Sequence, residues 1–334
     1  MTFALFLEWF IKSVVVILAL TIGFAYVTLF ERRVLAKFQV RIGPNRAGKQ
    51  GLLQPVADAL KLIFKEELIP EKADKLIFVL APVITMIPAL IITGVVPWGP
   101  PITLFGKTFT LSVADINLGV LYILTVTSIS VYGITLAGWS SNNKYATMGG
   151  LRATAQMISY ELALGLAFVG PILLASSMGI NDIIAAQKNV WYIVLQPVAA
   201  VIYFTAAVAE INRSPFDMPE AEQELTAGYH TEYSGMKFAL FFMAEYIKMI
   251  AISMIGASVF LGGYWGPGVA AHPWIGPIWF FVKVVAVLFV LVWIRATLPR
   301  IRYDRLMAFG WKILFPLALL NVMVTALVVT LTGG

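Results

Sequence analysis

Long runs of apolar residues alternate with shorter polar segments along the whole chain. Eight of these runs approach or exceed about 20 residues, the length that a helix needs to cross the hydrocarbon core of a bilayer. The pattern predicts an all-α integral membrane protein of about eight transmembrane helices. The expected spans are Phe6–Phe30, Leu76–Pro97, Val113–Gly138, Ile158–Ser176, Trp191–Ala209, Phe238–Leu261, Pro277–Thr297 and Met307–Thr330.

The spans predict one membrane domain over residues 1–334. The first span is too long for a cleaved signal peptide, and no small-residue cleavage site follows it, so we expect it to remain as an anchor. Two polar segments are long enough to carry structure of their own. They are residues 31–75 and 210–236.

The segment 31–75 contains apolar side chains at helical spacing, with polar side chains between them. This pattern is typical of an amphipathic helix that lies along the membrane surface, and we expect Pro70 to end it. A helix that only anchors the loop is the alternative. The apolar positions are Leu52, Leu53, Val56, Leu60, Ile63 and Phe64.

Composition supports a membrane protein and excludes several kinds of cofactor site. Charged residues make up 13% of the chain, whereas soluble domains carry about 25%. The absence of cysteine excludes iron–sulfur ligation and thiolate zinc sites. His230 and His272 are separated by one expected span, so they should lie on opposite sides of the membrane and cannot share a haem.

The distribution of lysine and arginine predicts the orientation. Residues 31–75 contain ten of them and residues 295–305 contain four, whereas the loops on the other side contain almost none. The positive-inside rule places these basic segments in the cytoplasm, which leaves both termini outside. The plain form of this pattern suits a bacterial plasma membrane. Because the basic charge is a topological signal, it does not indicate nucleic-acid binding.

The cytoplasmic segment 210–236 is acidic instead. Its only arginine is Arg213, and Pro215, Phe216, Met218 and Pro219 interrupt the acids, which favours a folded, partly buried loop over a solvated one. The acidic residues are Glu210, Asp217, Glu220, Glu222, Glu224 and Glu232.

Three glutamates fall within or at the ends of expected spans, namely Glu161, Glu210 and Glu245. A charge at a helix centre costs about 2.5–3.5 kcal/mol or more, so these side chains should face the protein interior and take part in proton or ion transfer. Structural pairing is the alternative. Lys248, three residues after Glu245, is expected to neutralise part of its charge.

Asp115 and Lys283 lie near span ends, where we expect them to reach the surface. The segment 43–50 approaches the phosphate-binding P-loop pattern, but it lacks the required Ser or Thr and follows no buried strand. No G-x-G-x-x-G fingerprint occurs either. We therefore expect no nucleotide site on this chain.

Three segments resemble one family along nearly the whole chain. The first is ERRVLAKFQVRIGPNR at 31–46 followed by GLLQPVADALK at 51–61. The second is AEINRSPFDMPEAEQEL at 209–225, continued by EYSG at 232–235, and the third is RATLPRIRYD at 295–304. Together they resemble the H subunit of proton-pumping NADH:quinone oxidoreductase, respiratory complex I.

The resemblance implies a membrane subunit that joins the two arms of the complex, forms much of the quinone chamber and begins the proton pathway. Quinone would be the substrate, and NADH, FMN and the iron–sulfur clusters would bind to partner subunits, with no cofactor and no independent catalysis on this chain. The implied quinone-binding residues are Arg32, Arg41, Arg295 and Arg300. The implied proton-pathway residues are Glu161, Glu210, Glu220, Glu222, Glu224, Glu232 and Glu245.

Further polar members of these sites would be Asp58, Lys61, Arg152, Arg213, Tyr229 and His230. Three other functions stay open. The chain could be the equivalent subunit of a membrane-bound hydrogenase or ferredoxin-linked dehydrogenase. A stand-alone ion transporter would predict repeated halves with paired broken helices, and no such repeat is found. A purely structural scaffold would leave the buried glutamates unexplained.

Overall fold

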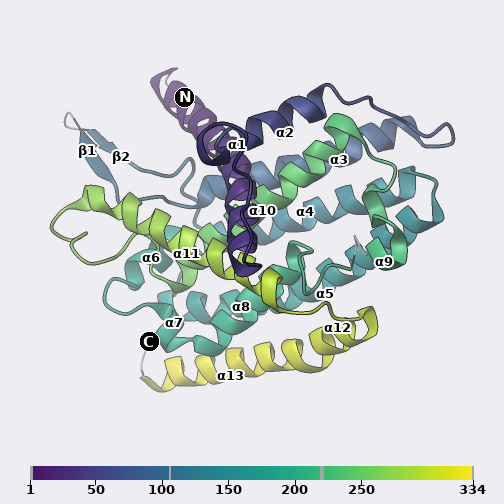
Figure 1. The fold of residues 1–334 in the computed structure, drawn as a ribbon. Helices are drawn as coiled ribbons and strands as arrows, with labels where there is room; N and C mark the ends of the chain where they lie inside the picture. The colour runs from purple at the N-terminus through teal and green to yellow at the C-terminus, as the bar shows by residue number, and fades with distance from the viewer. Residues whose placement is uncertain (1–2, 105–106, 219–221, 333–334) are drawn as a thin grey trace.

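A computed structural model describes residues 3–104, 107–218 and 222–332 of the chain, and these residues are mostly helical (Figure 1). The long helices are α1 (Phe3–Phe38), α3 (Lys75–Ile91), α4 (Gly119–Ser140), α5 (Lys144–Ala175), α10 (Gly235–Phe260), α11 (Gly276–Thr297) and α13 (Phe315–Thr332). The shorter helices are α2 (Gln54–Ile63), α6 (Ile180–Ala186), α7 (Tyr192–Leu195), α8 (Pro197–Glu210), α9 (Glu222–Leu225) and α12 (Tyr303–Phe309).

Single turns and one small hairpin complete the described structure. The turns are η1 (Lys49–Gly51), η2 (Ile92–Val95), η3 (Gly228–His230), η4 (Pro273–Ile275) and the π-helical η5 (Gly310–Leu314). Strands β1 (Ile102–Leu104) and β2 (Lys107–Phe109) pair antiparallel.

Seven helical stretches among the described residues are long and apolar enough to cross a membrane, which confirms the all-α membrane fold. They are Phe6–Phe38, Lys75–Val95, Gly119–Ser140, Lys144–Ala175, Gly235–Phe260, Pro273–Thr297 and Tyr303–Thr332.

The one expected span that is not among these seven, Trp191–Ala209, is a broken helix. It consists of α7 and the 14-residue α8, which meet at Gln196. Pro197 follows this residue, and a proline pushes the residue before it out of helical geometry. The Gln196 side chain donates to Thr325 Oγ1 at 2.9 Å, so the break is held against α13.

Two helices are longer than the hydrophobic pattern predicted. Helix α1 continues to Phe38 and α5 begins at Lys144 rather than near Ile158. The Asn143 side chain accepts from the Tyr145 amide at 3.0 Å and caps α5. The additional turns are polar, so apolar runs could not reveal them.

Helix α2 confirms the expected amphipathic helix, although its end was predicted wrongly. It stops at Ile63, with Phe64 as its C-cap, well before Pro70. Its hydrophobic residues Val56, Leu60 and Ile63 are exposed, as expected of a helix that offers an apolar face to a membrane.

The prediction that Lys283 reaches the surface is wrong, whereas Asp115 is exposed. Lys283 Nζ is turned inward and donates to the carbonyl oxygens of Leu261 at 2.5 Å, Gly263 at 2.9 Å and Trp265 at 2.5 Å. Three backbone acceptors replace the water that a lysine would otherwise seek. Lys283 therefore ties α11 to the segment that follows α10.

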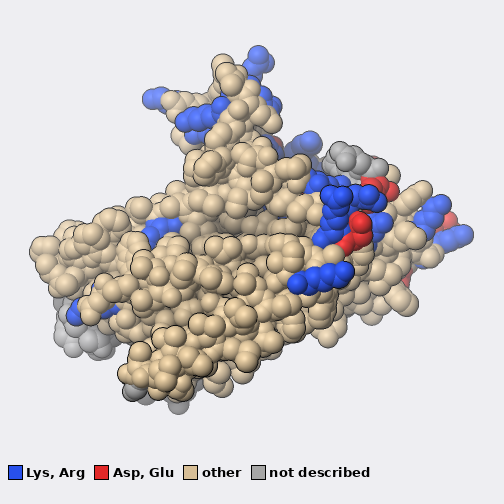
Figure 2. All heavy atoms as spheres, turned by 90° about the horizontal axis from the view of Figure 1, so that it is seen from below, with Lys and Arg blue, Asp and Glu red and all other residues tan. Residues whose placement is uncertain are grey.

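The core lies where α3, α4, α5, α8 and α10 pack together, and α1 crosses the bundle at a steep angle with α2 beside it (Figure 1). On the face shown in Figure 2, charged side chains gather at one end and on one projection, and most of the remaining surface is uncharged. This distribution is what a lipid-embedded body requires.

Candidate functional site

Four charged side chains from four parts of the chain meet at one end of the bundle. Glu31 of α1 is 2% exposed, and its two oxygens accept from Arg213 Nη1 at 2.8 and 2.7 Å. Arg295 of α11 also donates to Glu31, and Arg213 Nε donates to Glu245 of α10. Arg213 thus joins two carboxylates, and the four side chains together form one charged cluster.

Arg213 reaches this cluster because the chain turns sharply after α8. Asn212 has a positive φ of 53°, and the turn brings the Arg213 guanidinium to 4.2 Å from the Tyr246 ring centroid. Burial alone would lower the pKa of Arg213, but Glu245 and Glu31 hold it well above its usual range. Arg213 therefore stays charged and can stabilise both carboxylates.

Glu210 lies next to this cluster and interacts with the charge of Lys248. It is 2% exposed, and both of its carboxylate oxygens are buried with no hydrogen-bond partner among the described residues. A cavity of about 20 Å³ adjoins it and is also lined by Asn212, Glu245 and Lys248. A cavity needs about 10–15 Å³ to hold one water, so this one has room for a water between these groups.

The Lys248 charge interacts with Glu245, as expected, but Lys248 is not the hydrogen-bonded partner of this carboxylate. Lys248 Nζ donates to Ser130 Oγ at 2.6 Å, and Glu245 takes Arg213 as its partner. The tertiary fold brings Arg213 to Glu245 from 32 residues away, and this guanidinium replaces the lysine one turn further along the helix.

Glu161 lies apart from the charged cluster and has a different hydrogen-bond partner. The Ser128 hydroxyl of α4 donates to its carboxylate. The same carboxylate borders a groove of about 480 Å³ whose other walls are apolar, including Leu124, Leu162 and Phe315. Glu161 is thus close to the surface of the bundle as well as to its hydrogen-bonded interior.

The acidic loop is folded and partly buried, as expected: Phe216 is 6% exposed and Met218 is 1% exposed. Burial raises the pKa of Asp217, and Arg300 opposes this shift. Arg300 also contacts Met218 Sδ at 3.9 Å. Arg300 therefore lies against the acidic loop at Asp217 and Met218.

Glu224 and Glu232 of the loop have partners outside the central cluster. Glu224 pairs with Arg152 at 2.7 Å, and Glu232 accepts from Asn143 Nδ2 at 2.6 Å. Glu220 lies outside the described residues, and only the backbone of Glu222, the first residue of α9, is described. The predicted proton-pathway residues are therefore divided between the core and the loop surface.

A large groove of about 550 Å³ lies between α1, α2 and α10. Its walls are mostly apolar, with side chains such as Phe24, Leu62 and Phe242. Arg32 and Asp58, which form an ion pair at 2.7 Å, provide a polar edge together with Lys61. Such a groove suits a molecule with a long apolar part and a small polar head.

The four predicted quinone-binding arginines do not share one site. Arg32 lines the groove, Arg295 belongs to the charged cluster and Arg300 contacts the acidic loop. Arg41 is exposed and donates to Gln39 Oε1 at 2.7 Å. Only Arg32 lines the groove itself.

Sequence reasoning missed Glu31, which it took as the beginning of a basic loop. The signal was a glutamate directly after an apolar run, followed by two arginines. Because α1 continues past it, Glu31 lies on a helix and turns inward. Among the described residues no group of three His, Cys, Asp or Glu side chains could hold a metal ion.

Comparison with known proteins gives consistent matches. The model of the NADH dehydrogenase family matches residues 11–326. A protein of Syntrophobacter fumaroxidans, named as the second H subunit of NADH-quinone oxidoreductase, is 50% identical over 320 residues, which are 96% of this chain and 95% of that protein. The first H subunit of Geobacter metallireducens is 51% identical, covering 92% of each chain, and the H subunit of Thermomicrobium roseum is 51% identical, covering 91% of each.

Proposed function

Because the chain belongs to the NADH dehydrogenase family and is a membrane subunit of complex I, we propose that it forms the wall of the quinone chamber and begins the proton pathway. The enzyme is the assembled oxidoreductase, of which this multi-pass subunit is one part. Two features support the proposal, namely the groove between α1, α2 and α10 and the buried charges beside it.

The groove matches the chemistry of a quinone. An isoprenoid tail needs an apolar channel that opens to the bilayer, and the carbonyl oxygens of the ring need donors. The walls of α1 and α10 provide the first, and Arg32 and Lys61 at the polar edge provide the second. Proposed with them at the chamber are Arg41, Arg295 and Arg300.

The observation that carries the proposal is the continuity from Arg32 to Glu210. Arg32 lines the groove, while the preceding residue, Glu31, binds Arg213. Arg213 binds Glu245, which borders the same small cavity as Glu210. Arg32 and Glu31 are successive residues of α1, and between Glu31 and Glu210 the row of contacting groups is interrupted only by a cavity with space for one water.

Reduction of a quinone adds two electrons and takes up two protons, so negative charge develops in the groove before protonation is complete. Carboxylates that interact strongly share their protons and respond together to such a charge. Arg213 can move its hydrogen bonds between Glu31 and Glu245 as their charges change. The proton pathway would continue from Glu210 towards Glu161 and include Glu220, Glu222, Glu224 and Glu232.

The proposal also includes the partner subunits of the chain and its orientation in the membrane. Partner subunits of the peripheral arm would carry NADH, FMN and the iron–sulfur clusters, and subunits of the membrane arm would continue the proton pathway. The basic loops would face the cytoplasm of a bacterium, with both termini outside its plasma membrane.

The test is Glu210→Gln in the whole complex reconstituted into vesicles. The glutamine amide cannot take up or release a proton. The variant should therefore reduce proton translocation driven by NADH oxidation by about 100-fold, which is the typical effect of losing a proton-transfer group. Asp304→Asn is the matched control, because Asp304 is 70% exposed at its side chain and should leave translocation unchanged. Full translocation by Glu210→Gln would exclude this residue from the pathway.

A further inference from the structure

A buried glutamine of α5 contacts the turn that carries Arg213. Gln156 is 0% exposed. Its side-chain nitrogen Nε2 donates to the carbonyl oxygens of Ala209 and Phe216, each at 2.8 Å, and to Asn212 Oδ1 at 3.2 Å. Ala209 precedes Arg213 along the chain and Phe216 follows it. One amide group from another helix therefore binds the turn on both sides of the arginine.

The orientation of this amide follows from its neighbours. The oxygens of Ala209 and Phe216 are backbone carbonyls, which can only accept hydrogen bonds, so the NH2 end of the Gln156 side chain must face them. The carbonyl end, Oε1, is buried with no hydrogen-bond partner among the described residues. Gln156 is therefore held by the hydrogen bonds that it donates to the turn.

Neighbouring side chains of α5 hold the same turn. Met157 Sδ accepts from Asn212 Nδ2 at 3.6 Å. The ring of Tyr160, one helical turn after Gln156, lies 5.6 Å from the Phe216 ring, measured between centroids. Both α5 side chains are fully buried. The turn after α8 therefore lies against one face of α5.

The backbone of the turn does not fix its shape alone. The Arg213 amide donates to the Val208 carbonyl at 3.5 Å, which is long for a hydrogen bond between backbone groups. Asn212 has a left-handed φ of 53°, a conformation that persists in residues other than glycine when the surroundings hold it. The turn thus needs contacts from outside, and Gln156 supplies them at both ends.

The backbone carbonyls of the turn do not depend on Gln156 for a donor. The Ala209 carbonyl also accepts from the Asn212 amide at 3.2 Å, and the Phe216 carbonyl also accepts from the Met218 amide at 3.0 Å. Loss of the glutamine amide would therefore leave neither carbonyl unsatisfied, which is the condition that makes a buried polar group costly. We expect such a loss to shift the turn while the chain still folds.

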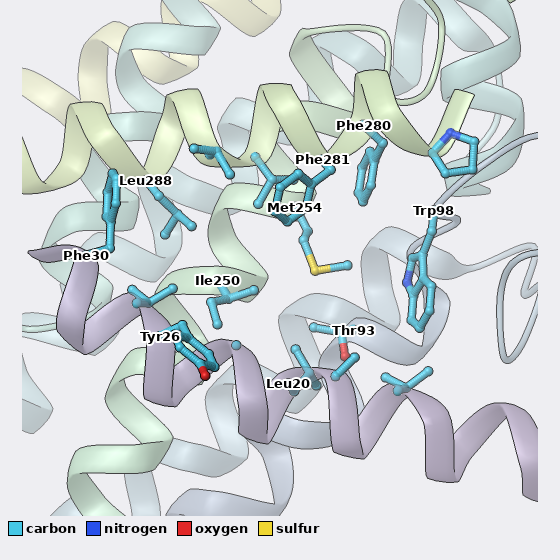
Figure 3. A pocket seen from close by; sticks show the side chains of 17 residues that line it. Leu20, Tyr26, Phe30, Thr93, Trp98, Ile250, Met254, Phe280, Phe281 and Leu288 are labelled. Atoms are coloured by element: carbon cyan, nitrogen blue, oxygen red, sulfur yellow. The ribbon is translucent and has the colours of Figure 1, made fainter. Parts of the chain in front are cut away.

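Two helices on the other side of the charged cluster pack less closely. A second groove, of about 540 Å³, lies between α1, α10 and α11, and its described lining residues include no charged side chain. Figure 3 shows α1 and α11 on opposite sides of this groove, with Phe30 and Leu288 at one end. Only 22% of the most apolar stretch of α1 is buried, compared with 50% for α5. Within the chain, α5 is therefore a firmer support for Arg213 than α1 is.

We propose that Gln156 is a positioning residue of the proton pathway, whose amide holds the turn after α8 so that Arg213 reaches both Glu31 and Glu245. This inference rests on the proposed function of that pathway. Gln156 has no titratable group of its own, so it acts on protons only through the turn. The same amide binds the last turn of α8, where Glu210 borders the small cavity.

The test replaces the amide by a side chain of similar length. Gln156→Met fills the same space but cannot donate a hydrogen bond. In the whole complex reconstituted into vesicles, we expect proton translocation driven by NADH oxidation to fall about tenfold, which is the effect of losing about one ordinary hydrogen bond. The KM for quinone should stay unchanged, because Gln156 does not line the groove between α1, α2 and α10.

Gln187→Met is the matched control. Gln187 is also 0% exposed, and its amide group donates to the Ser258 carbonyl and accepts from the Gly262 amide, each at 2.9 Å. Ser258 lies 13 positions beyond Glu245 on α10, which is roughly 20 Å along the helix. The control should lose at least as much thermal stability as Gln156→Met, yet it should translocate protons at the wild-type rate.

A second measurement locates the arginine directly. A cryo-electron microscopy map of the Gln156→Met complex should show the turn displaced and Arg213 no longer bound to both Glu31 and Glu245. Arg213 in its original place would overturn the positioning role. Equal losses of translocation in Gln156→Met and Gln187→Met would also overturn it, because they would indicate a general loss of structure.

Glu210→Gln separates this inference from the proposed function. Full translocation by Gln156→Met together with impaired translocation by Glu210→Gln would overturn the inference and leave the proposed pathway standing. Full translocation by both variants would overturn the pathway itself, and the role of Gln156 in it.

Discussion

Arg213 shows how a single residue can organise charges far apart in sequence. It reaches Glu31, which lies 182 positions away, and Glu245, which lies 32 positions away. A buried ion pair adds little stability over an apolar replacement, but removing one partner costs about 3–5 kcal/mol because the other charge stays buried. A gain in stability therefore does not by itself explain the cluster.

His230 gives a test of burial at the residue scale. It packs 5.5 Å from the Phe238 ring, measured between centroids, and burial lowers its pKa from the usual 6.5 to about 4. Between these two values the unfolded chain binds a proton that the folded chain does not. Stability should therefore fall as pH decreases from 6.5 to 4, by at most about 1.4 kcal/mol per pH unit.

The measurement compares thermal unfolding of the purified complex at pH 7.5 and pH 5 for the wild type and for His230→Phe. The variant keeps an aromatic ring but loses the titration, so its stability should decrease less at pH 5. His272→Phe, at an exposed histidine, serves as the control and should follow the wild type. Identical pH profiles for all three proteins would contradict the assignment.

At the scale of elements, the long helices owe their positions to a few close approaches. Helix α5 crosses the turn η3 at Gly149, where a Cβ would lie 2.7 Å from the Tyr229 backbone nitrogen and 2.8 Å from Gly228 Cα. Backbone atoms cannot yield as a side chain can. The polar first half of α5 is therefore held against the loop that carries Tyr229 and His230.

We predict that Gly149→Ala lowers the stability of the complex by at least about 1–3 kcal/mol, the usual penalty of overpacking. Gly165→Ala on the same helix is the matched control, since its Cβ would only contact Leu124 Cδ1 at 3.8 Å. It should be neutral or slightly stabilising because alanine favours helix more than glycine does. Thermal unfolding of both variants checks this, and equal effects would refute the close approach.

At the scale of the whole molecule, α1 divides two grooves of similar size. One has a polar edge at Arg32 and Asp58, and the other lacks charged residues in its lining. The same helix carries Glu31 into the interior between them. A shift of α1 would therefore alter both grooves and the charged cluster together.

We predict that Ala239→Trp, which obstructs the groove between α1, α2 and α10, raises the KM for a long-tailed quinone about tenfold or more. A quinone without a tail needs less of the groove and should be affected less. Ile22→Trp places the same side chain at a position of α1 that is 57% exposed and lines neither groove. Steady-state kinetics with both quinones test this prediction. An unchanged KM in Ala239→Trp would exclude the groove between α1, α2 and α10 as the quinone site.

The sequence alone determined the class of the protein because apolar runs and loop charges act locally. Seven of the expected spans, the amphipathic helix α2 and the family follow from patterns in consecutive residues. Helix ends were less predictable where polar residues continue a helix, as at the end of α1 and the beginning of α5.

Only the tertiary structure decided which charges meet. Spacing along α10 favoured Lys248 as the partner of Glu245, whereas the fold brings Arg213 there and sends Lys248 to Ser130. Buried charges take the partner that chain topology delivers, and contacts between residues so far apart along the chain leave no periodic trace in sequence. For the same reason, the unpartnered oxygens of Glu210 and the two grooves beside α1 became visible only in the folded chain.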